Sequence, residues 1–276
     1  LKSFFILGFY ALLTSMYTTF NTAFLGFKGG STEVGYYATA IKLFSIILSL
    51  YTAFTTVMMP RMSSLLAEGR TEEFREKLNT SNDLLMAFTL PLVIIGFIYA
   101  PEVISIISGK GYEGAIIPMR IIMPLVFIIG YEQILVIQTL MPLKKDKAIF
   151  INSVIGATIG IILNIILVPI YKSIGSSVVW LCSELSVFAS AQYFVIKYTR
   201  IQFPLRKFGY FLLLSILPAL LCIGIRYISN NILVRLSILF VDAIYYFYMY
   251  VYVAKIGLLR SILSKNHKIA SFLRID

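Results

Sequence analysis

Long apolar stretches separated by short polar segments recur along the whole chain. Each is about 20 residues long, the length that a helix needs to cross the hydrocarbon core of a bilayer. Gly, Pro and charged residues mark the breaks between the stretches. The pattern predicts eight membrane-spanning helices, at residues 4–27, 36–59, 84–107, 116–141, 148–168, 177–196, 208–225 and 233–254.

The composition agrees with this pattern. Hydrophobic residues make up 59% of the chain and charged residues 13%, and the mean hydropathy is +0.87. A soluble domain has about 45–50% apolar and about 25% charged residues. These values exclude water-soluble globular, disordered, coiled-coil and nucleic-acid-binding proteins, despite a net charge of +11. The predicted fold class is an all-α integral membrane protein.

The positive charge is distributed unevenly between the two ends of the predicted helices. If residue 1 is cytoplasmic, 17 of the 24 Lys and Arg residues fall on the cytoplasmic side and five on the outer side. Because short cytoplasmic loops are enriched in Lys and Arg, both ends of the chain are predicted to be cytoplasmic. Lys42 and Arg120 are the two cations left within spans.

The predicted loops leave no room for a soluble domain. Outer connections at 28–35, 108–115 and 169–176 are each about eight residues long. The longest inner loop, residues 60–81, has apolar residues at helical spacing among charged ones. This spacing predicts an amphipathic segment that lies along the inner membrane face.

A polar stripe crosses the second span. Its members recur at intervals of three and four residues, which places them on one helix face: Lys42, Ser45, Ser49, Thr52 and Thr56. Lipid disfavours such a face, so we expect it to meet protein or a water-filled cavity that binds substrate. Helix–helix hydrogen bonding is the alternative for the stripe, and snorkelling to the outer interface is the alternative for Lys42. Asn21 in the first span is expected at a similar depth.

The fourth span adds a second cation. Arg120, Tyr131 and Gln138 are spaced by 11 and 18 residues, close to whole turns, so they are predicted to share one face. Two cations at one depth suit a cavity that receives an anion, although Arg120 could also snorkel. Arg120 and Gln138 join Lys42, Asn21, Ser45, Ser49 and Thr52 as candidate substrate-binding residues.

Other polar residues in the spans are candidates for ion coupling or for packing. Glu132, Glu184 and Asp242 are candidate proton carriers, with a structural hydrogen bond to a neighbouring helix as the alternative. Small and amide residues at four-residue spacing in the fifth span predict close helix packing: Asn152, Gly156, Gly160 and Asn164. Cys182, Cys222 and the lone His267 form no metal or disulfide pattern, so we expect no metal and no cofactor.

Four stretches resemble a known family in their order and spacing. They read FLGFKGGSTEVGYYATAIKL at 24–43, TVMMPRMSSL at 56–65, APEVISIISGKGYEGAIIPMRIIMP at 100–124 and QTLMPLKKDKAIFINSVIGATIGIILNIILVPIY at 138–171. The family is the Wzx-type oligosaccharide flippases of the MATE-like (MOP) exporter superfamily. The sequence departs from it at Gly175-Ser176-Ser177, where a Gly-Ala-Ala type run is more usual.

The resemblance implies an architecture and a function. Family members have about 14 spans, in two six-helix lobes and a trailing pair. Residues 1–200 would then be the second lobe and 201–276 the trailing pair with a basic cytoplasmic tail, the first lobe being absent. The implied activity is transfer of an undecaprenyl-diphosphate-linked oligosaccharide across the bacterial inner membrane, for O-antigen or capsule synthesis. Polysaccharide polymerase machinery is an implied partner. Lys42 matches a lysine that follows the family's V-G-Y-Y stretch.

Two other functions remain open from the sequence. One is an ion-coupled exporter of another substrate on the same fold. The other is a membrane enzyme of polysaccharide assembly, such as an O-antigen polymerase, which would present catalytic residues on larger outer loops.

Overall fold

The computed structural model describes residues 2–228, 237, 241–242, 244–246 and 248–249. These residues are helical or lie in short connections, and no strand occurs among them, which confirms the all-α fold class. The predicted span at 233–254 is therefore covered only in part, and His267 lies outside the described residues, as does the side chain of Cys222.

Four helical stretches of the described residues are long and apolar enough to cross a membrane. They are Thr19–Ala67, Thr71–Ile98, Glu113–Leu140 and Asp146–Thr199. The helices themselves are α1 (Lys2–Ala67), α2 (Thr71–Ile98), α3 (Ala100–Ser108), η1 (Glu113–Ala115), α4 (Ile116–Ile122), α5 (Leu125–Leu135), η2 (Val136–Leu140), α6 (Asp146–Thr199) and α7 (Leu205–Ile228). The chain is a multi-pass membrane protein.

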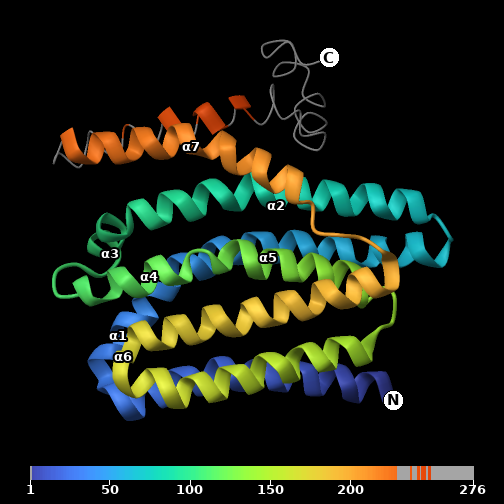
Figure 1. Cartoon of the computed structure of the whole chain (residues 1–276), viewed down its shortest axis with the longest axis horizontal. Helices are drawn as coiled ribbons and strands as arrows, with labels where there is room; N and C mark the ends of the chain where they lie inside the picture. The colour runs from blue at the N-terminus through green and yellow to red at the C-terminus, as the bar shows by residue number, and fades with distance from the viewer. Residues whose placement is uncertain (1, 229–236, 238–240, 243, 247, 250–276) are drawn as a thin grey trace. The chain divides into compact units, whose positions relative to one another are not determined.

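Two of these helices are hairpins, because one residue in each reverses the chain (Figure 1). Gly30 (φ 81°, ψ 177°) divides α1 into a first limb, residues 2–29, and a second limb, residues 31–67. Lys172 (φ 48°, ψ −123°) divides α6 into a first limb, 146–171, and a second limb, 173–199. Glycine adopts the positive φ at residue 30 without a steric penalty. The predicted outer loops of about eight residues are thus replaced by much tighter reversals.

The two reversals lie against each other. The Ser173 backbone N–H and hydroxyl both donate to Glu33 Oε2, at 3.2 and 2.5 Å. Glu33 thereby satisfies a free backbone donor at the start of the second limb of α6. The limbs of α6 also approach closely, since a Cβ placed on Gly175 would lie 2.6 Å from the Leu167 carbonyl oxygen.

Residues 60–81 differ from the prediction. They do not form a separate surface helix, because α1 continues to Ala67 and α2 begins at Thr71. Leu65, Phe74 and Leu78 are buried, so the apolar side of this segment packs against protein. The turn at 68–70 is closed by ion pairs of Arg70 with Glu68 and Glu73. Hydrogen bonds from the Ser64 hydroxyl and Arg70 lower the pKa of the Glu68 carboxyl.

The third and fourth spans are interrupted where the sequence predicted continuous helices. The third ends at Ile98, and a separate helix, α3, follows with Pro101 in its first turn. The fourth consists of α4, α5 and the π-helical η2, with Met123 and Pro124 between the first two. Pro124 lacks the N–H that would continue the helix, so the break falls where expected for proline.

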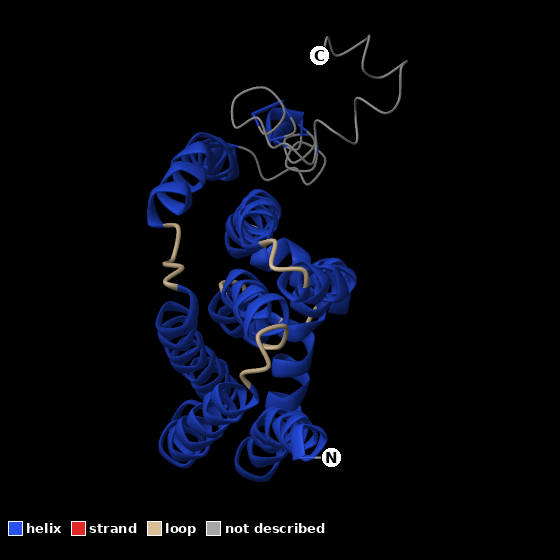
Figure 2. Ribbon diagram, turned by 90° about the vertical axis from the view of Figure 1, so that its right-hand side faces the viewer, coloured by secondary structure: helices blue, strands red, loops and turns tan. Residues whose placement is uncertain are grey.

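The described residues cluster into two compact units. One contains residues 1–75 and 99–203, and the other contains 76–98 and 204–276. In the first unit, the reversals of α1 and α6 and the α3–α4 connection lie at one end. The connections at 68–70 and 141–145 lie at the other end (Figure 1). Figure 2 views the helices of the first unit nearly end-on.

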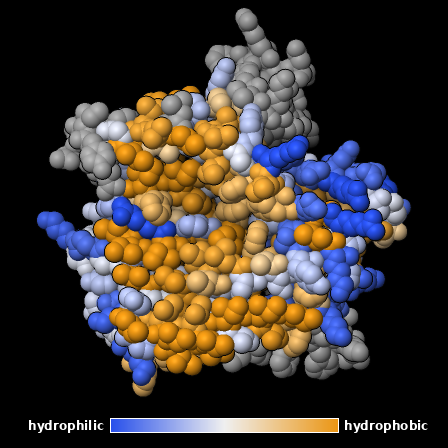
Figure 3. Space-filling model, in the orientation of Figure 1, coloured by the Kyte–Doolittle hydropathy of each residue, from blue (hydrophilic) through white to orange (hydrophobic). Residues whose placement is uncertain are grey.

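The first limb of α6 carries large exposed apolar side chains, as a lipid-facing helix does. They include Ile161, Ile165 and Ile170. On the face drawn in Figure 3, apolar side chains cover the middle of the helices and hydrophilic side chains lie toward both ends. On the inner side of the same limb, Asn152, Gly156, Gly160 and Asn164 are all buried, in keeping with the predicted packing role.

Candidate functional site

The polar stripe of the second span lies on the outer surface of the first unit. Lys42, Ser45, Ser49 and Thr56 are exposed and Thr52 is half-buried. The other side of the same limb forms the core through residues such as Phe44, Ile47 and Tyr51. Within the described residues, a hydrogen bond from Gln133 Nε2 to Thr52 Oγ1 at 2.8 Å joins the stripe to α5.

The hydroxyls of the stripe are partly satisfied within their own helix. Ser49 donates to the Ile46 carbonyl (2.8 Å), Thr52 to the Leu48 carbonyl (3.0 Å) and Thr56 to the Thr52 carbonyl (2.8 Å). Each hydroxyl retains acceptor capacity for an incoming group. Helix–helix hydrogen bonding, the alternative reading, thus applies within the described residues only at Thr52.

Asn21 is buried where three helical limbs meet. Its Nδ2 donates to the Tyr37 hydroxyl and to the Ser176 carbonyl, both at 3.0 Å. Residues 21 and 37 lie at similar distances from the reversal at Gly30, so they are at the same depth. Lys42 is five residues, or about 7.5 Å, further along the helix than Tyr37. Asn21 thus holds the two α1 limbs against α6.

A pair of carboxyl groups lies inside the same unit. Glu132 of α5 and Glu184 of α6 are both buried, and their carboxyls lie within hydrogen-bonding reach of each other. The indole N–H of Trp180 donates to Glu184 Oε1 at 2.9 Å. The sequence predicted both residues as candidate proton carriers but did not predict that they pair. Two adjacent carboxyls can share one proton, because both cannot carry a charge at such close range.

The remaining residues of the fourth span do not share one straight helix face. Met123 and Pro124 separate Arg120 from Tyr131, and the π-helical turn η2 separates Tyr131 from Gln138. Arg120 is half-buried. The Tyr131 hydroxyl donates to Gln192 Oε1 at 3.0 Å in α6, and Gln138 is fully buried. The predicted shared face assumed an uninterrupted helix of 3.6 residues per turn, and these breaks remove that assumption.

Other polar candidates lie elsewhere. Asp242 is buried and belongs to the second unit. Asn152 accepts a hydrogen bond from the Ser190 hydroxyl (2.6 Å), and Asn164 donates to the Gly160 carbonyl (2.9 Å). Within the described ranges, no three His, Cys, Asp or Glu side chains gather in a way that could hold a metal ion.

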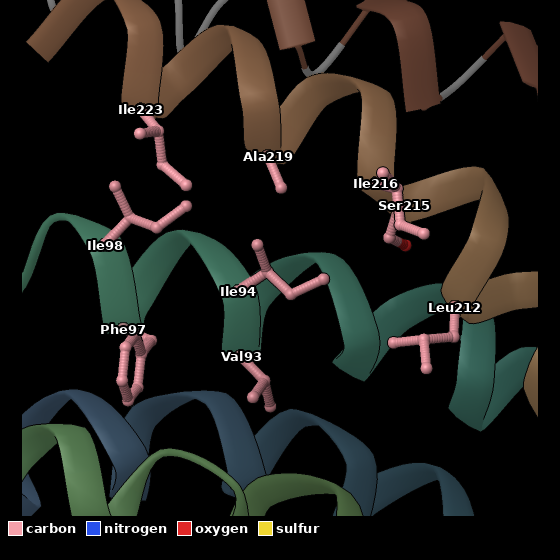
Figure 4. A pocket seen from close by; sticks show the side chains of 9 residues that line it. All are labelled: Val93, Ile94, Phe97, Ile98, Leu212, Ser215, Ile216, Ala219 and Ile223. Carbon is pink, nitrogen blue, oxygen red and sulfur yellow. The ribbon is translucent and has the colours of Figure 1, made fainter.

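The second unit contains an apolar groove of about 300 Å³ between α2 and α7 (Figure 4). Its α2 side is formed by Val93, Ile94, Phe97 and Ile98, and its α7 side by Leu212, Ser215, Ile216, Ala219 and Ile223. The one polar lining residue, Ser215, donates its hydroxyl to the Phe211 carbonyl of its own helix (2.9 Å). The groove therefore offers a hydrocarbon surface.

Comparisons with known proteins agree on one kind of relative. A family described as "Polysaccharide biosynthesis protein" matches residues 2–117. The "Putative O-antigen transporter" of Escherichia coli (strain K12) is 27% identical over 184 residues, which are 64% of this chain and 43% of that protein. The "Probable flippase AglR" of Haloferax volcanii is 26% identical over 175 residues, 60% of this chain and 35% of that protein.

A solved structure has the same fold. The "Lipid II flippase MurJ, inward closed conformation" superposes with a TM-score of 0.73 at 16% identity, covering 87% of this chain and 50% of that chain. The resemblance to the Wzx-type flippases of the MATE-like exporter superfamily is confirmed. The chain spans half the length of this structure and less than half of the two curated relatives. These relatives are named as transporters or flippases, not as enzymes.

Sequence reasoning missed one residue of the site. Trp180 lies at the junction of the Asn21–Tyr37 contact and the carboxyl pair, with Phe44 and Tyr37 packed against its ring. It is the single tryptophan of the chain. Its rarity in the chain and its position four residues before Glu184 were the two features of the sequence that could have identified it.

Proposed function

We propose that this chain is the substrate-contacting lobe of a flippase. The cargo is an undecaprenyl-diphosphate-linked oligosaccharide, moved from the inner to the outer leaflet for O-antigen or capsule synthesis. One observation carries the proposal: a helix of a membrane protein presents an exposed row of hydroxyls headed by Lys42. An ionised side chain in the bilayer is disfavoured by roughly 2.5–3.5 kcal/mol on insertion scales, and a hydrated cavity removes that penalty.

The chemistry of the stripe suits a diphosphate headgroup. The ammonium of Lys42 is a compact, strongly hydrated charge that can pair with phosphate oxygens. Ser45 and Ser49 add hydroxyls along the path. Arg120 is proposed as a second contact for the anion, while Asn21 and Gln138, both buried, would act by holding the surrounding helices. A second lobe that faces the stripe would complete the cavity, in accord with relatives about twice as long.

The apolar groove between α2 and α7 supports the same proposal. A polyprenyl tail has no polar group beyond its diphosphate. The groove offers this tail an apolar surface, and its one polar lining group, the Ser215 hydroxyl, is already hydrogen-bonded within its own helix. The lipid tail would therefore stay in an apolar environment while the headgroup crosses a polar one.

The carboxyl pair of Glu132 and Glu184 is proposed to supply ion coupling. One proton shared by two buried carboxyls can be released and taken up as the surroundings change. Asp242 in the second unit is a further candidate. We propose a bacterial inner-membrane location with both chain ends cytoplasmic, based on the Lys and Arg distribution, and polysaccharide polymerase machinery as the consumer of the exported unit.

Substitutions at Lys42 test the proposal in a flippase-deficient strain that expresses this chain with its companion lobe. Lys42→Arg keeps the charge and should retain appreciable transport. Lys42→Ala and Lys42→Glu should lose at least about tenfold, since one charged contact is worth about 1.5–3 kcal/mol. Surface polysaccharide is measured per amount of membrane protein.

Lys110, an exposed lysine in the outer α3–α4 connection, is the matched control. Lys110→Glu changes the same charge away from the stripe and should leave transport near the wild-type level. Normal transport by Lys42→Glu would contradict a role in anion contact. A lower protein level with unchanged transport per molecule would instead indicate that Lys42 snorkels and assists insertion.

A further inference from the structure

A pocket of about 410 Å³ lies in the first unit between the two limbs of α1 and the second limb of α6. Its lining residues are Thr19, Thr22, Tyr37, Ile41 and Trp180. This volume falls within the range of about 300–1,000 Å³ found for small-molecule sites. The lining combines two aromatic rings with threonine hydroxyls and contains no charged side chain.

The ring of Trp180 is held in one orientation. Its N–H donates to Glu184 Oε1 at 2.9 Å. The Phe44 ring packs edge-on against it at 4.9 Å and 73°, and the Tyr37 ring at 6.5 Å and 62°. Trp180 is nevertheless half-exposed, because part of it lines the pocket. The pocket therefore has a fixed aromatic wall, and a ligand that stacks on it does not have to order the indole first.

The polar groups of the pocket are uncharged. Thr19 and Thr22, one helical turn apart, bring hydroxyls that can donate or accept. The Tyr37 hydroxyl is fixed by the bond that it accepts from Asn21 Nδ2. A diphosphate would need a cation here, whereas a sugar ring needs an aromatic face for its C–H groups and hydroxyls for its own hydroxyls. The negative face of an aromatic ring attracts such C–H groups.

Lys42, the proposed contact for the diphosphate, is next to this pocket in the sequence. Ile41 lines the pocket, and Lys42, the next residue, is exposed on the polar stripe. In a lipid-linked oligosaccharide, the first sugar is bonded directly to the diphosphate. We infer that the pocket binds this first sugar ring, stacked on Trp180, while Lys42 binds the adjoining diphosphate. This inference rests on the proposed function and adds a sugar-binding subsite to it.

The single tryptophan provides a direct measurement. The 276-residue chain is placed in nanodiscs and titrated with undecaprenyl diphosphate carrying glucose, galactose or N-acetylglucosamine, and with bare undecaprenyl diphosphate. At least one sugar-bearing lipid should change Trp180 emission saturably. It should also bind about three- to tenfold more tightly than the bare lipid, the range expected for one aromatic stacking contact.

Variants separate stacking from general packing, and binding of all of them is followed by native mass spectrometry because the two Trp180 variants lack the fluorophore. Trp180→Leu should abolish the preference for the sugar-bearing lipid and leave the affinity for the bare lipid unchanged. Trp180→Phe keeps an aromatic face and should retain part of the preference. Thr22→Val preserves the shape of the site and should reduce the preference. Tyr193→Leu removes an exposed aromatic ring elsewhere on the same limb and should change neither affinity.

The outcomes distinguish the subsite from the proposed function. Equal binding of all sugar-bearing lipids and the bare lipid, with binding that depends on Lys42, would overturn the subsite and leave the flippase proposal standing. Failure of every diphosphate lipid to bind this chain would overturn the subsite and the contact of Lys42 with the diphosphate, while the transport assay with the companion lobe tests the flippase proposal separately. A saturable change in Trp180 emission with phosphatidylglycerol alone, not displaced by the sugar-bearing lipids, would show that an acyl chain fills the pocket and would also refute the subsite.

Discussion

The hairpins α1 and α6 are built alike, but their exposed faces carry different kinds of side chain. Each is reversed by one residue with positive φ. The exposed face of the second α1 limb mixes Lys42, Ser49 and Thr56 with Ile46 and Leu50. The exposed face of the first α6 limb is almost entirely apolar. Hydropathy therefore identifies both as spans, but the exposed polar residues distinguish the surface that meets water or protein from the one that meets lipid.

The largest expected effect comes from placing the same charge on both surfaces. Ile165→Lys puts a cation on the lipid-facing side of α6, which disfavours insertion by about 2.5–3.5 kcal/mol. The amount of inserted protein should fall severely. Ser49→Lys puts the same charge on the stripe and should insert normally. Equal loss of both variants, measured as membrane-integrated protein, would remove the distinction between the two surfaces.

The two reversals should respond differently to an added methyl group. Gly175→Ala brings a Cβ within 2.6 Å of the Leu167 carbonyl oxygen, so the limbs of α6 must separate. We expect a loss of about 1–3 kcal/mol in stability, as for other overpacked sites. Gly30→Ala meets no neighbouring atom, but φ 81° with ψ 177° is a conformation that essentially only glycine adopts, and the strain costs on the order of 1–3 kcal/mol. Thermal unfolding in detergent gives both values, and a more stable Gly175→Ala variant would contradict the close approach.

The inward side of α6 gives the third test. Glu184→Gln and Glu132→Gln each remove one carboxyl of the pair and should flatten the pH dependence of transport. Because the two groups act together, the double variant should be no worse than the more impaired single variant. Asp146→Asn, at the start of α6, is the control and should keep the wild-type pH profile. Additive losses in the double variant would indicate that the two carboxyls act separately.

The last test concerns only the orientation of the chain in the membrane, and it should have the smallest effect on transport. In a background with Cys182 and Cys222 replaced by Ser, Ser31→Cys and Tyr171→Cys lie beside the two reversals. Both should react in intact cells with a thiol reagent that does not cross the membrane. Lys147→Cys, at the opposite end of α6, should react only after the cells are opened. All three variants should transport normally, and outside labelling of Lys147→Cys would reverse the proposed topology.

The hydropathy pattern was sufficient to predict spans within the described residues, because crossing a bilayer depends on length and composition. It was not sufficient for their details. The reversals at Gly30 and Lys172 are shorter than the predicted loops, since the helices continue almost to the turn. Pro124 was visible in the sequence, but the π-helical turn that follows was not. Because the prediction from the sequence assumed a continuous helix, it could not establish whether Arg120 and Gln138 lie on one face of the fourth span.

The site was predicted unevenly for a similar reason. The face of Lys42 follows from spacing within one helix, and the structure places it on the surface. The pairing of Glu132 with Glu184 depends on how α5 packs against α6, which no periodicity within either helix specifies. Trp180 was missed because its significance depends on its packing against Tyr37 and Phe44 of another helix, α1.

The carboxylate of Glu33 has a consequence for how the protein is made. Glu33 lies 140 residues before Ser173 and accepts hydrogen bonds from the Ser173 backbone N–H and hydroxyl. Chains are synthesised from the amino terminus at about 5–20 residues per second, so the α1 hairpin exists for several seconds before its partner emerges. During that time Glu33 has no helix end to cap, and the hairpin is held by contacts between its own limbs, such as Asn21 to Tyr37, and by the helices already made, such as α4 and α5. Joining of the two reversals is therefore a late step of assembly, and a nascent chain stopped before residue 173 should lack it.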